Sequence, residues 1–426
     1  MDFNKEIGVF PKSCPRKSLY IGLMSGTSMD GIDAALLNID NHQLVAAHTS
    51  LYEPELAASL KSLMSSAAKA EIGLVYQTNR LVGEAFAKAA NELIIKTRID
   101  RKDIKAIGSH GQTIIHAPLA LPPYTVQLGC PYTIALRTGL TVVADFRTKD
   151  LILGGQGAPL APLYHQEVFK KLAKPLAIVN IGGIANITFL LPGNIYSQQL
   201  GFRRGANERA EGVYTQYTTS SERVCNKAEN HALCEGRGSS AKSIVRGYDV
   251  GPGNCIIDAY AHKHLGTSYD KNGALAASGK VVDNLLTTLL QDPFFSRPAP
   301  KSLDKAYFAL EKINHLFAKN LSIENIQATL TAFTAHAIAL AIKKENIALK
   351  HILVCGGGVH NLYLMNVLQS LLVETKIESS AQYDISPDYV EAMMCAWLAH
   401  MRIQKKTLVL KNITGGGTTL LGSIYL

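Results

Sequence analysis

The sequence lacks several features that would assign it to a class at once. Its seven cysteines form an odd set without a Cys-x-x-Cys pair, and no eighteen apolar residues run together. Such cysteine usage suits a reducing compartment. The start, MDFNKEIGVFPKSCPRKSLY, has no long apolar segment. We therefore expect neither a secretory signal nor a transmembrane span, and predict a cytoplasmic protein.

Long runs of one charge are also missing. The net charge is +9 and the pI is about 9.0, but the basic residues are scattered and few aromatic residues lie among them. A small anionic substrate, or solubility alone, explains this balance better than nucleic acid does, and no membrane partner is expected. The oligomeric state stays open, a homodimer included.

The 426 residues, 47% of them hydrophobic, exceed what one core usually serves, so two domains of about 200 residues are expected. Two series of elements follow the same order. The first has strands at 20–24, 32–39 and 43–52, then helices, IKAIGSHGQTIIH and LTVVADF. The second begins at Leu176 with LAIVNIGGIANITFLL and ends with HILVCGGGVHN and a helix at 362–372. The repeated pattern predicts two similar α/β domains facing one cleft.

We place the N-terminal domain at 17–145 and the C-terminal domain at 146–426, with a substrate loop at 146–175. Whether the extreme C-terminus packs back on the first domain stays open. The segment 197–244 is polar and without apolar periodicity, so we expect a disordered surface insertion. A zinc site at Cys225, His231 and Cys234 fits no strong spacing template.

Glycine turns carry the first chemical signal. MSGTSMDG and NIGGIAN each join two strands, and CGGG follows a third. Any one of them reads as a tight bend, but turns in matching places of two domains favour a polyphosphate held between them. The first turn lacks the lysine of the usual phosphate loop. Asp30 or Asp33 suits Mg²⁺, which takes few carboxylates and keeps several waters.

Asp249, in GYDVGPGN, is the candidate catalytic carboxylate. It is placed at the end of a strand before Gly-Pro-Gly, where it should project into the cleft and take a proton from a hydroxyl or a water. The alternative is a capping role for the helix near Asn254, for which Asn254 itself is the better candidate.

A basic loop and a histidine complete the candidates. In ADFRTKD, Arg147 and Lys149 follow a strand and suit a carboxylate or phosphate of a substrate, and a solvated basic loop is the alternative. His110 in GSHGQ is a better site candidate than His116, although a lone histidine is more often structural.

These motifs resemble those of the anhydro-N-acetylmuramic acid kinases. GLMSGTSMDGID, IGSHGQTIIH, VVADFRTKD with GGQGAPL, VNIGGIANIT, DVGPGN and VCGGGVHN occur in the order of that family, from Ser18 to the C-terminus except for the insertion. The family belongs to the superfamily of sugar kinases, actin and heat-shock chaperones, so the resemblance implies an α/β fold with two RNase H-like domains around a nucleotide cleft.

The implied reaction phosphorylates 1,6-anhydro-N-acetylmuramic acid with ATP and opens its anhydro ring with water, giving N-acetylmuramic acid 6-phosphate and ADP in peptidoglycan recycling and amino-sugar catabolism. Asp249 would be the general base. Arg147, Lys149, His110 and Glu391 would contact the sugar, and Lys149 stands where relatives often have arginine. Asp30 would hold Mg²⁺. The implied ATP site comprises Gly26, Thr27, Ser28, Met29, Asp30, Gly31, Ile32, Asp33, Gly182, Gly183, Gly356, Gly357 and Gly358.

Two other classes remain to be compared with the kinase. An actin-like or chaperone-like ATPase would need a filament or peptide-binding surface, and no substrate domain is appended here. A dinucleotide oxidoreductase is excluded because no Gly-x-Gly-x-x-Gly opens a helix after the first strand.

Overall fold

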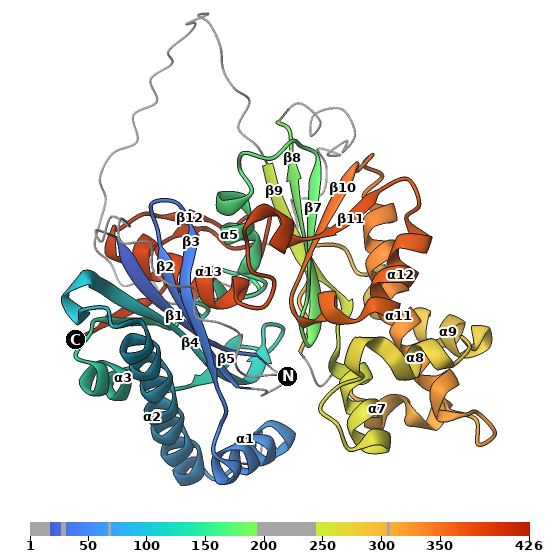
Figure 1. Cartoon of the computed structure of the whole chain (residues 1–426), viewed down its shortest axis with the longest axis horizontal. Coiled ribbons are helices and arrows are strands. Elements are labelled where there is room, and N and C mark those ends of the chain that lie inside the picture. Colours follow the sequence, from blue (N-terminus) through green and yellow to red (C-terminus); the bar gives the residue numbers. More distant parts are fainter. Residues whose placement is uncertain (1–17, 27–30, 67–69, 194–243, 305–306) are drawn as a thin grey trace, which may run out of the picture. The chain divides into compact units, whose positions relative to one another are not determined.

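The first sheet gathers strands from both ends of the chain. The computed structural model describes residues 18–26, 31–66, 70–193, 244–304 and 307–426 (Figure 1). In this part of the chain seven strands pair in the order β14-β6-β4-β1-β2-β3, with β5 beside β4. They are β1 (Leu19–Ser25), β2 (Ile32–Asn38), β3 (Gln43–Ser50), β4 (Ile104–Ala117), β5 (Tyr124–Leu128), β6 (Val142–Ala144) and β14 (Ser423–Tyr425).

The second sheet repeats the strand order of the first. Its order is β11-β10-β7-β8-β9. The strands of each series can be numbered 1 to 5 along the chain, from β1 in the first sheet, where β6 is the fifth, and from β7 in the second. Both sheets then have the order 3-2-1-4-5. In both, the second strand is antiparallel and the fourth parallel to the first. This RNase H-like order confirms the predicted fold class. The strands are β7 (Leu176–Ile181), β8 (Ile184–Leu191), β9 (Ile244–Pro252), β10 (His351–Cys355) and β11 (Lys376–Ser379).

Two long helices stand out in the described part of the chain. They are α2 (Ile72–Thr97) and α11 (Ile323–Lys344). The other helices are α1 (Pro54–Ser66), α3 (Pro131–Thr138), α4 (Thr148–Ile152), α5 (Ala161–Val168), α7 (Cys255–Leu265), α8 (Ala274–Ser278), α9 (Asp283–Leu290), α10 (Leu310–Ile313), α12 (Leu362–Leu371) and α13 (Val390–Ile403). Short 3-10 turns lie at 101–103, 271–273, 293–296, 314–316, 357–360 and 380–383, and a small sheet pairs β12 (Leu408–Val409) with β13 (Thr418–Thr419).

Helix α11 is apolar because the protein covers it. By length and composition it could cross a membrane, but 83% of its most apolar window is buried within the protein. It packs against α7, α8, α9 and α12, and its side chains join the core of the second half of the chain. This helix therefore reads as a core helix.

Both faces of β1 are buried, so its sequence LYIGLMS is almost wholly apolar. Successive side chains alternate between the faces of a strand. Leu19, Ile21 and Leu23 join one core with α1 and α2, whereas Tyr20 and Met24 join another with α13. The first sheet thus lies between α2 and α13 (Figure 1).

Helix α13 lies directly on the backbone of the first sheet. A Cβ atom on Gly22 of β1 would stand 1.7 Å from the carbonyl oxygen of Ala392, and one on Gly108 of β4 would stand 1.9 Å from that of Cys395. Only glycine allows this approach. Strand β14 pairs antiparallel with β6, so residues near the C-terminal end complete the N-terminal sheet.

The predicted insertion falls outside the main compact unit. Met1–Leu190 and Val245–Leu426 form one unit and Leu191–Ile244 the other. Residues 194–243 lie outside the described part of the chain, as do Cys225, His231 and Cys234. The expectation of a disordered insertion stays a prediction.

Replacing Gly22 with alanine should separate α13 from the sheet. We expect Gly22→Ala to lower the free energy of unfolding by about 3 kcal/mol or more, the upper end for overpacked cores. Urea titration followed by the fluorescence of Trp397 reports on α13 directly, since this buried residue is the single tryptophan of the chain.

The matched control is Gly73→Ala on the exposed start of α2, where a Cβ would meet nothing closer than a Glu71 oxygen at 3.5 Å. It should leave stability unchanged or raise it by about 0.5–1 kcal/mol. Equal unfolding midpoints for the two variants would contradict the close packing of α13.

Candidate active site

Asp249 is a buried carboxylate held by the segment that follows η4 (Pro293–Ser296). It is 5% exposed, its N–H donates to the Lys301 carbonyl at 3.0 Å, and its Oδ2 accepts from the Leu303 N–H at 2.7 Å. Burial raises the pKa of Asp249 to about 7, although the Leu303 N–H and the charge of Arg147 lower it. The carboxylate therefore exchanges a proton near neutral pH, as a general base must.

The structure changes one detail of the prediction for Asp249 and rules out the alternative of a helix cap. It lies inside β9, three residues before the end at Pro252, because the strand continues into Gly-Pro. It does not cap the next helix. Asn254 occupies the N-cap position of α7, and its side-chain nitrogen donates to the Ile181 carbonyl at 3.2 Å.

Arg147 is a cation that interacts electrostatically with Asp249. It precedes α4, and its charge acts on the carboxylates of Asp249 and Glu391. Its Nε donates to Nε2 of His110 at 3.0 Å, while Nδ1 of His110 donates to the Gly111 carbonyl at 2.9 Å. Burial, and then the charge of Arg147, lower the pKa of His110 to about 3. His110 is therefore a neutral acceptor that orients Arg147.

Glu391 brings a second carboxylate from the first turn of α13. It is half-buried, and its Oε1 accepts from Nδ2 of Asn180 at 3.0 Å. Burial raises the pKa of Glu391, while Arg147 and Asn180 lower it. Asp249, Arg147 and Glu391 thus form one charged cluster, to which β9, the segment before α4 and α13 each contribute one residue.

Lys149 is exposed, whereas Lys301 interacts with Asp249. Lys149, predicted at the substrate, is exposed on α4. Lys301, which the sequence analysis missed, has its Nζ 4.1 Å from the ring centre of Phe294 and interacts electrostatically with Asp249. Burial lowers the pKa of Lys301 to about 8. Its loop, RPAPKSL, shows no pattern that could have singled it out.

Asn180 was not predicted as a site residue, although its place in the sequence could have indicated it. It is a polar residue near the end of a fully buried strand, one position before the Ile181-Gly-Gly turn. Besides binding Glu391, its Oδ1 accepts from the thiol of Cys355 at 3.6 Å. A buried amide at a strand end needs partners, and here it links β7, β10 and α13.

The predicted glycine turns of the second sheet meet one another. The Gly182 carbonyl accepts from the Asn254 N–H at 2.8 Å, and the Gly183 carbonyl accepts from the N–H groups of Gly253 and Cys255 at 3.0 and 3.1 Å. Gly356, at φ +80°, lies so close to β7 that a Cβ would stand 2.6 Å from the Ile181 carbonyl.

Two glycines of these turns have room for a Cβ at ordinary van der Waals distance. A Cβ on Gly182 would meet nothing nearer than 3.7 Å, and one on Gly357 nothing nearer than 3.9 Å. Gly358 is different, because a Cβ there would stand 2.3 Å from the Ile181 side chain. Gly182 and Gly357 are therefore not needed for packing.

The first turn is tied to β4 at its base. Oγ of Ser25 lies 2.8 Å from the Gly31 carbonyl oxygen and 2.7 Å from Oε1 of Gln112, so its single proton is shared between these two acceptors. Nε2 of Gln112 donates to the Gly26 carbonyl at 3.3 Å. Gln112, in SHGQT, is a third residue that the sequence analysis missed. Thr27, Ser28, Met29 and Asp30 lie outside the described residues, and with them the predicted metal ligand.

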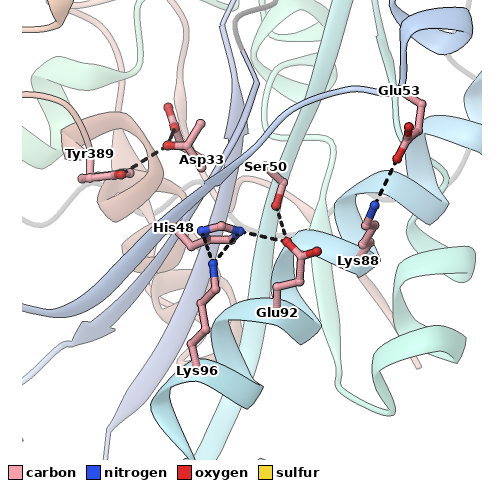
Figure 2. Close-up of polar contacts among 9 residues, drawn as sticks. Asp33, His48, Ser50, Glu53, Lys88, Glu92, Lys96 and Tyr389 are labelled. Atoms are coloured by element: carbon pink, nitrogen blue, oxygen red, sulfur yellow. Dashed lines mark hydrogen bonds and ion pairs between the residues drawn. The ribbon is translucent and has the colours of Figure 1, made fainter. Parts of the chain in front are cut away.

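Asp33 and Ile32 begin β2 beside this turn. Ile32 is buried in the core. Asp33 is half-buried, and its Oδ1 accepts from Oγ1 of Thr49 at 2.7 Å, which lies 3.2 Å from the hydroxyl of Tyr389 (Figure 2). Asp33 is thereby held against the segment that leads into α13.

Two RNase H-like sheets with glycine turns and a buried carboxylate define the superfamily of sugar kinases and actin-like ATPases. The family model of anhydro-N-acetylmuramic acid kinase matches residues 18–208 and 240–426. A relative from Legionella pneumophila (strain Paris), named anhydro-N-acetylmuramic acid kinase, is 43% identical over 96% of this chain and 98% of its own. One of the same name from Xanthomonas axonopodis pv. citri (strain 306) is 40% identical over 96% and 98%.

The chain therefore belongs to the anhydro-N-acetylmuramic acid kinase family, and it is an ATP-dependent sugar kinase. The family match leaves out residues 209–239, which fall within the predicted insertion.

Solved structures give a more distant likeness. An activator of 2-hydroxyisocaproyl-CoA dehydratase from Clostridium difficile, with bound ADPNP, is 12% identical at a TM-score of 0.42, over 91% of this chain and 96% of its own. A ROK family glucokinase from Streptomyces griseus, in complex with glucose and AMPPNP, is 12% identical at a TM-score of 0.36, over 90% and 100%.

Removing the charge of Arg147 should move the pH dependence of activity. A general base works deprotonated, so kcat/KM should rise as pH rises through about 7, the pKa of Asp249. Arg147 lowers this pKa, and an opposite charge nearby shifts a carboxyl pKa by about 1–3 units. In Arg147→Gln the rise should therefore move upward by about one pH unit or more.

Lys149→Gln is the matched control, since it removes the same charge two residues along the chain from an exposed side chain. Its profile should overlay that of the parent. An unmoved profile for Arg147→Gln, or an equal shift for both variants, would show that Arg147 does not act on the titrating group.

Proposed function

We propose that this kinase acts on 1,6-anhydro-N-acetylmuramic acid with Asp249 as its general base. Asp249 takes a proton from a water molecule, whose oxygen forms a bond to the anomeric carbon. The bond between that carbon and O6 breaks, and O6 forms a bond to the γ-phosphorus as the bond to the ADP oxygen breaks. The products are N-acetylmuramic acid 6-phosphate and ADP. The observation that carries this proposal is the buried carboxylate of Asp249, which the Leu303 N–H holds and on which the charges of Arg147 and Glu391 act.

The charged cluster suits a substrate that carries a carboxylate. We assign Arg147 to the lactyl carboxylate, because a guanidinium offers two parallel donors to one carboxylate. His110 supports this role from behind, by accepting from Nε of Arg147. Glu391, held by Asn180, is assigned to the sugar hydroxyl or amide. Lys149 is exposed, so we propose for it a long-range electrostatic role at most.

ATP is assigned to the glycine turns. Packing within the protein does not require glycine at 182 or 357, which suits a nucleotide that approaches the backbone closely. Gly183, Gly356 and Gly358 shape these turns. We also assign Gly26 to Asp33 to the ATP phosphates, as the resemblance to the family implies. Phosphoryl transfer needs mainly positioning and charge neutralisation.

Magnesium is expected with ATP, and the described residues are compatible with it. Mg²⁺ is usually held by one or two carboxylates, by phosphates and by water. Asp33 is a half-buried oxygen ligand fixed by Thr49, and Asp30 stands three residues earlier. We propose Asp30 as the ligand, with Asp33 as the alternative. When bound, the ion neutralises charge that develops on the transferring phosphate.

The proposed substrate places the enzyme after a reaction that releases anhydro-muramic acid from peptidoglycan. We therefore propose a role in peptidoglycan recycling and amino-sugar catabolism, in the cytoplasm, where ATP is available. An ATPase that drives a binding cycle would hydrolyse ATP without the sugar. ATP turnover that requires the anhydro-sugar, with the phosphorylated product identified by mass spectrometry, tests the assignment.

Asp249→Asn should abolish turnover while both ligands still bind. Loss of a general base usually lowers rates by about 10²–10⁴-fold. The amide keeps the shape, and its oxygen still accepts from the Leu303 N–H. Calorimetry with ATP and with the sugar measures binding, and a coupled ADP assay measures turnover. Activity within threefold of the parent would show that Asp249 is not the general base.

Gly182→Ala and Gly357→Ala should weaken ATP binding selectively. Both glycines have room for a Cβ in the protein, so any loss comes from the nucleotide. Overpacking by about 1–3 kcal/mol corresponds to a loss of about 5- to 150-fold in affinity for ATP. The KM for the sugar and the unfolding midpoint should match those of the control Gly73→Ala. An unchanged KM for ATP in both variants would remove these turns from the ATP site.

A further inference from the structure

Asp150 is a second buried carboxylate, which the reaction outlined above does not use. It is 0% exposed and lies in α4, three residues after Arg147. Its Oδ2 accepts from the Gly157 N–H at 2.7 Å, and its Oδ1 accepts from Oγ1 of Thr414 at 2.9 Å. Both donors are uncharged, and they come from segments more than 250 residues apart. An ionised group is costly to bury, so its retention here needs a reason.

Two glycine loops wrap closely around this carboxylate. A Cβ on Gly155 would stand 2.3 Å from Oδ1 of Asp150, and one on Gly416 would stand 2.0 Å from the same atom. The loops also bind each other, since the Gln156 N–H donates to the Thr414 carbonyl at 2.8 Å. Asp150 therefore joins GGQG and TGGG into a single arrangement.

This arrangement leads to Asp249 through one side chain. Oε1 of Gln156 accepts from Oγ of Ser302 at 3.3 Å. Ser302 lies between the two residues that hold Asp249, namely Lys301 through its carbonyl and Leu303 through its N–H. Gly415 supports the same segment, because a Cβ there would stand 3.0 Å from Pro300. On the other side, the Leu151 N–H donates to the Arg147 carbonyl at 3.2 Å.

We infer that Asp150 is a positioning residue for the reaction: it fixes the 154–157 and 414–416 loops together, and through Gln156 and Ser302 it keeps the 301–303 segment on Asp249. The inference rests on the proposed role of Asp249. Asp150 touches neither substrate nor reacting atoms in this role. The chemistry depends on it because a small displacement of a reacting group lowers rates by up to about 10²-fold.

The test compares Thr414→Val with Thr414→Ser, and Asp150→Asn with both. Valine removes the hydroxyl donor at similar volume, and serine keeps it. We expect kcat to fall by about 3- to 10-fold in Thr414→Val, the range of one hydrogen bond, and to return to near the parent in Thr414→Ser. Asp150→Asn should lower kcat by about 10- to 100-fold, and adding Thr414→Val to it should lower kcat no further.

Two further measurements separate positioning from a purely structural role. The KM for ATP should stay within about twofold, because the glycine turns are not touched. The rise of kcat/KM with pH should move to higher pH, because a loosened Leu303 N–H no longer lowers the pKa of Asp249. A structural role would lower the amount of folded enzyme, measured by circular dichroism, and leave the pH profile in place.

Each outcome decides between the hypotheses. If Asp249→Asn keeps its turnover, the proposed base is wrong whatever Asp150 does. If Asp249→Asn is inactive while Thr414→Val keeps the parent kcat and pH profile, the inference about Asp150 is overturned. Should Asp150→Asn fail to fold, the Thr414 pair alone carries the test. Additive losses in the double variant would also contradict a shared positioning role.

Discussion

The contact of α13 with the backbone of β1 and β4 is the constraint on which the site depends. Gly22 and Gly108 let the helix come within van der Waals distance of the sheet, and its first turn then presents Glu391. Asn180 reaches Glu391 from β7 of the second sheet, so the same helix links the two halves of the site. A side chain at either glycine would displace the helix and the carboxylate together.

Burial and the charges within the cluster act in opposite directions on the pKa values of its carboxylates. Burial raises the pKa of Asp249 to about 7, and Arg147 limits this rise. Arg147 needs an orienting acceptor, which His110 supplies in its neutral form. The carboxylates and the guanidinium are therefore interdependent: a charge removed at one position changes the proton affinity of the others.

Much of the fold could be predicted from the sequence because the central strands of both sheets are buried on two faces. Continuous apolar strands with glycine turns, the helical period of α2 and the long apolar run of α11 can be recognised in a single sequence. The order of the two series predicted the repeated sheet. The sequence also pointed to Asp249, Arg147 and the glycine turns, since charged or flexible residues next to buried strands need a purpose.

The sequence by itself determined the elements, their repetition and the family, because these follow from local periodicity and contiguous motifs. Only the tertiary structure decided that β14 pairs with the first sheet and that α13 packs on it. It also decided that Lys301 rather than Lys149 lies near Asp249. The contacts of Asp150 with Thr414 and of Asn180 with Glu391 join residues more than 200 positions apart. Such pairs leave no trace in local pattern, because the chain brings them together only when both sheets and α13 have packed.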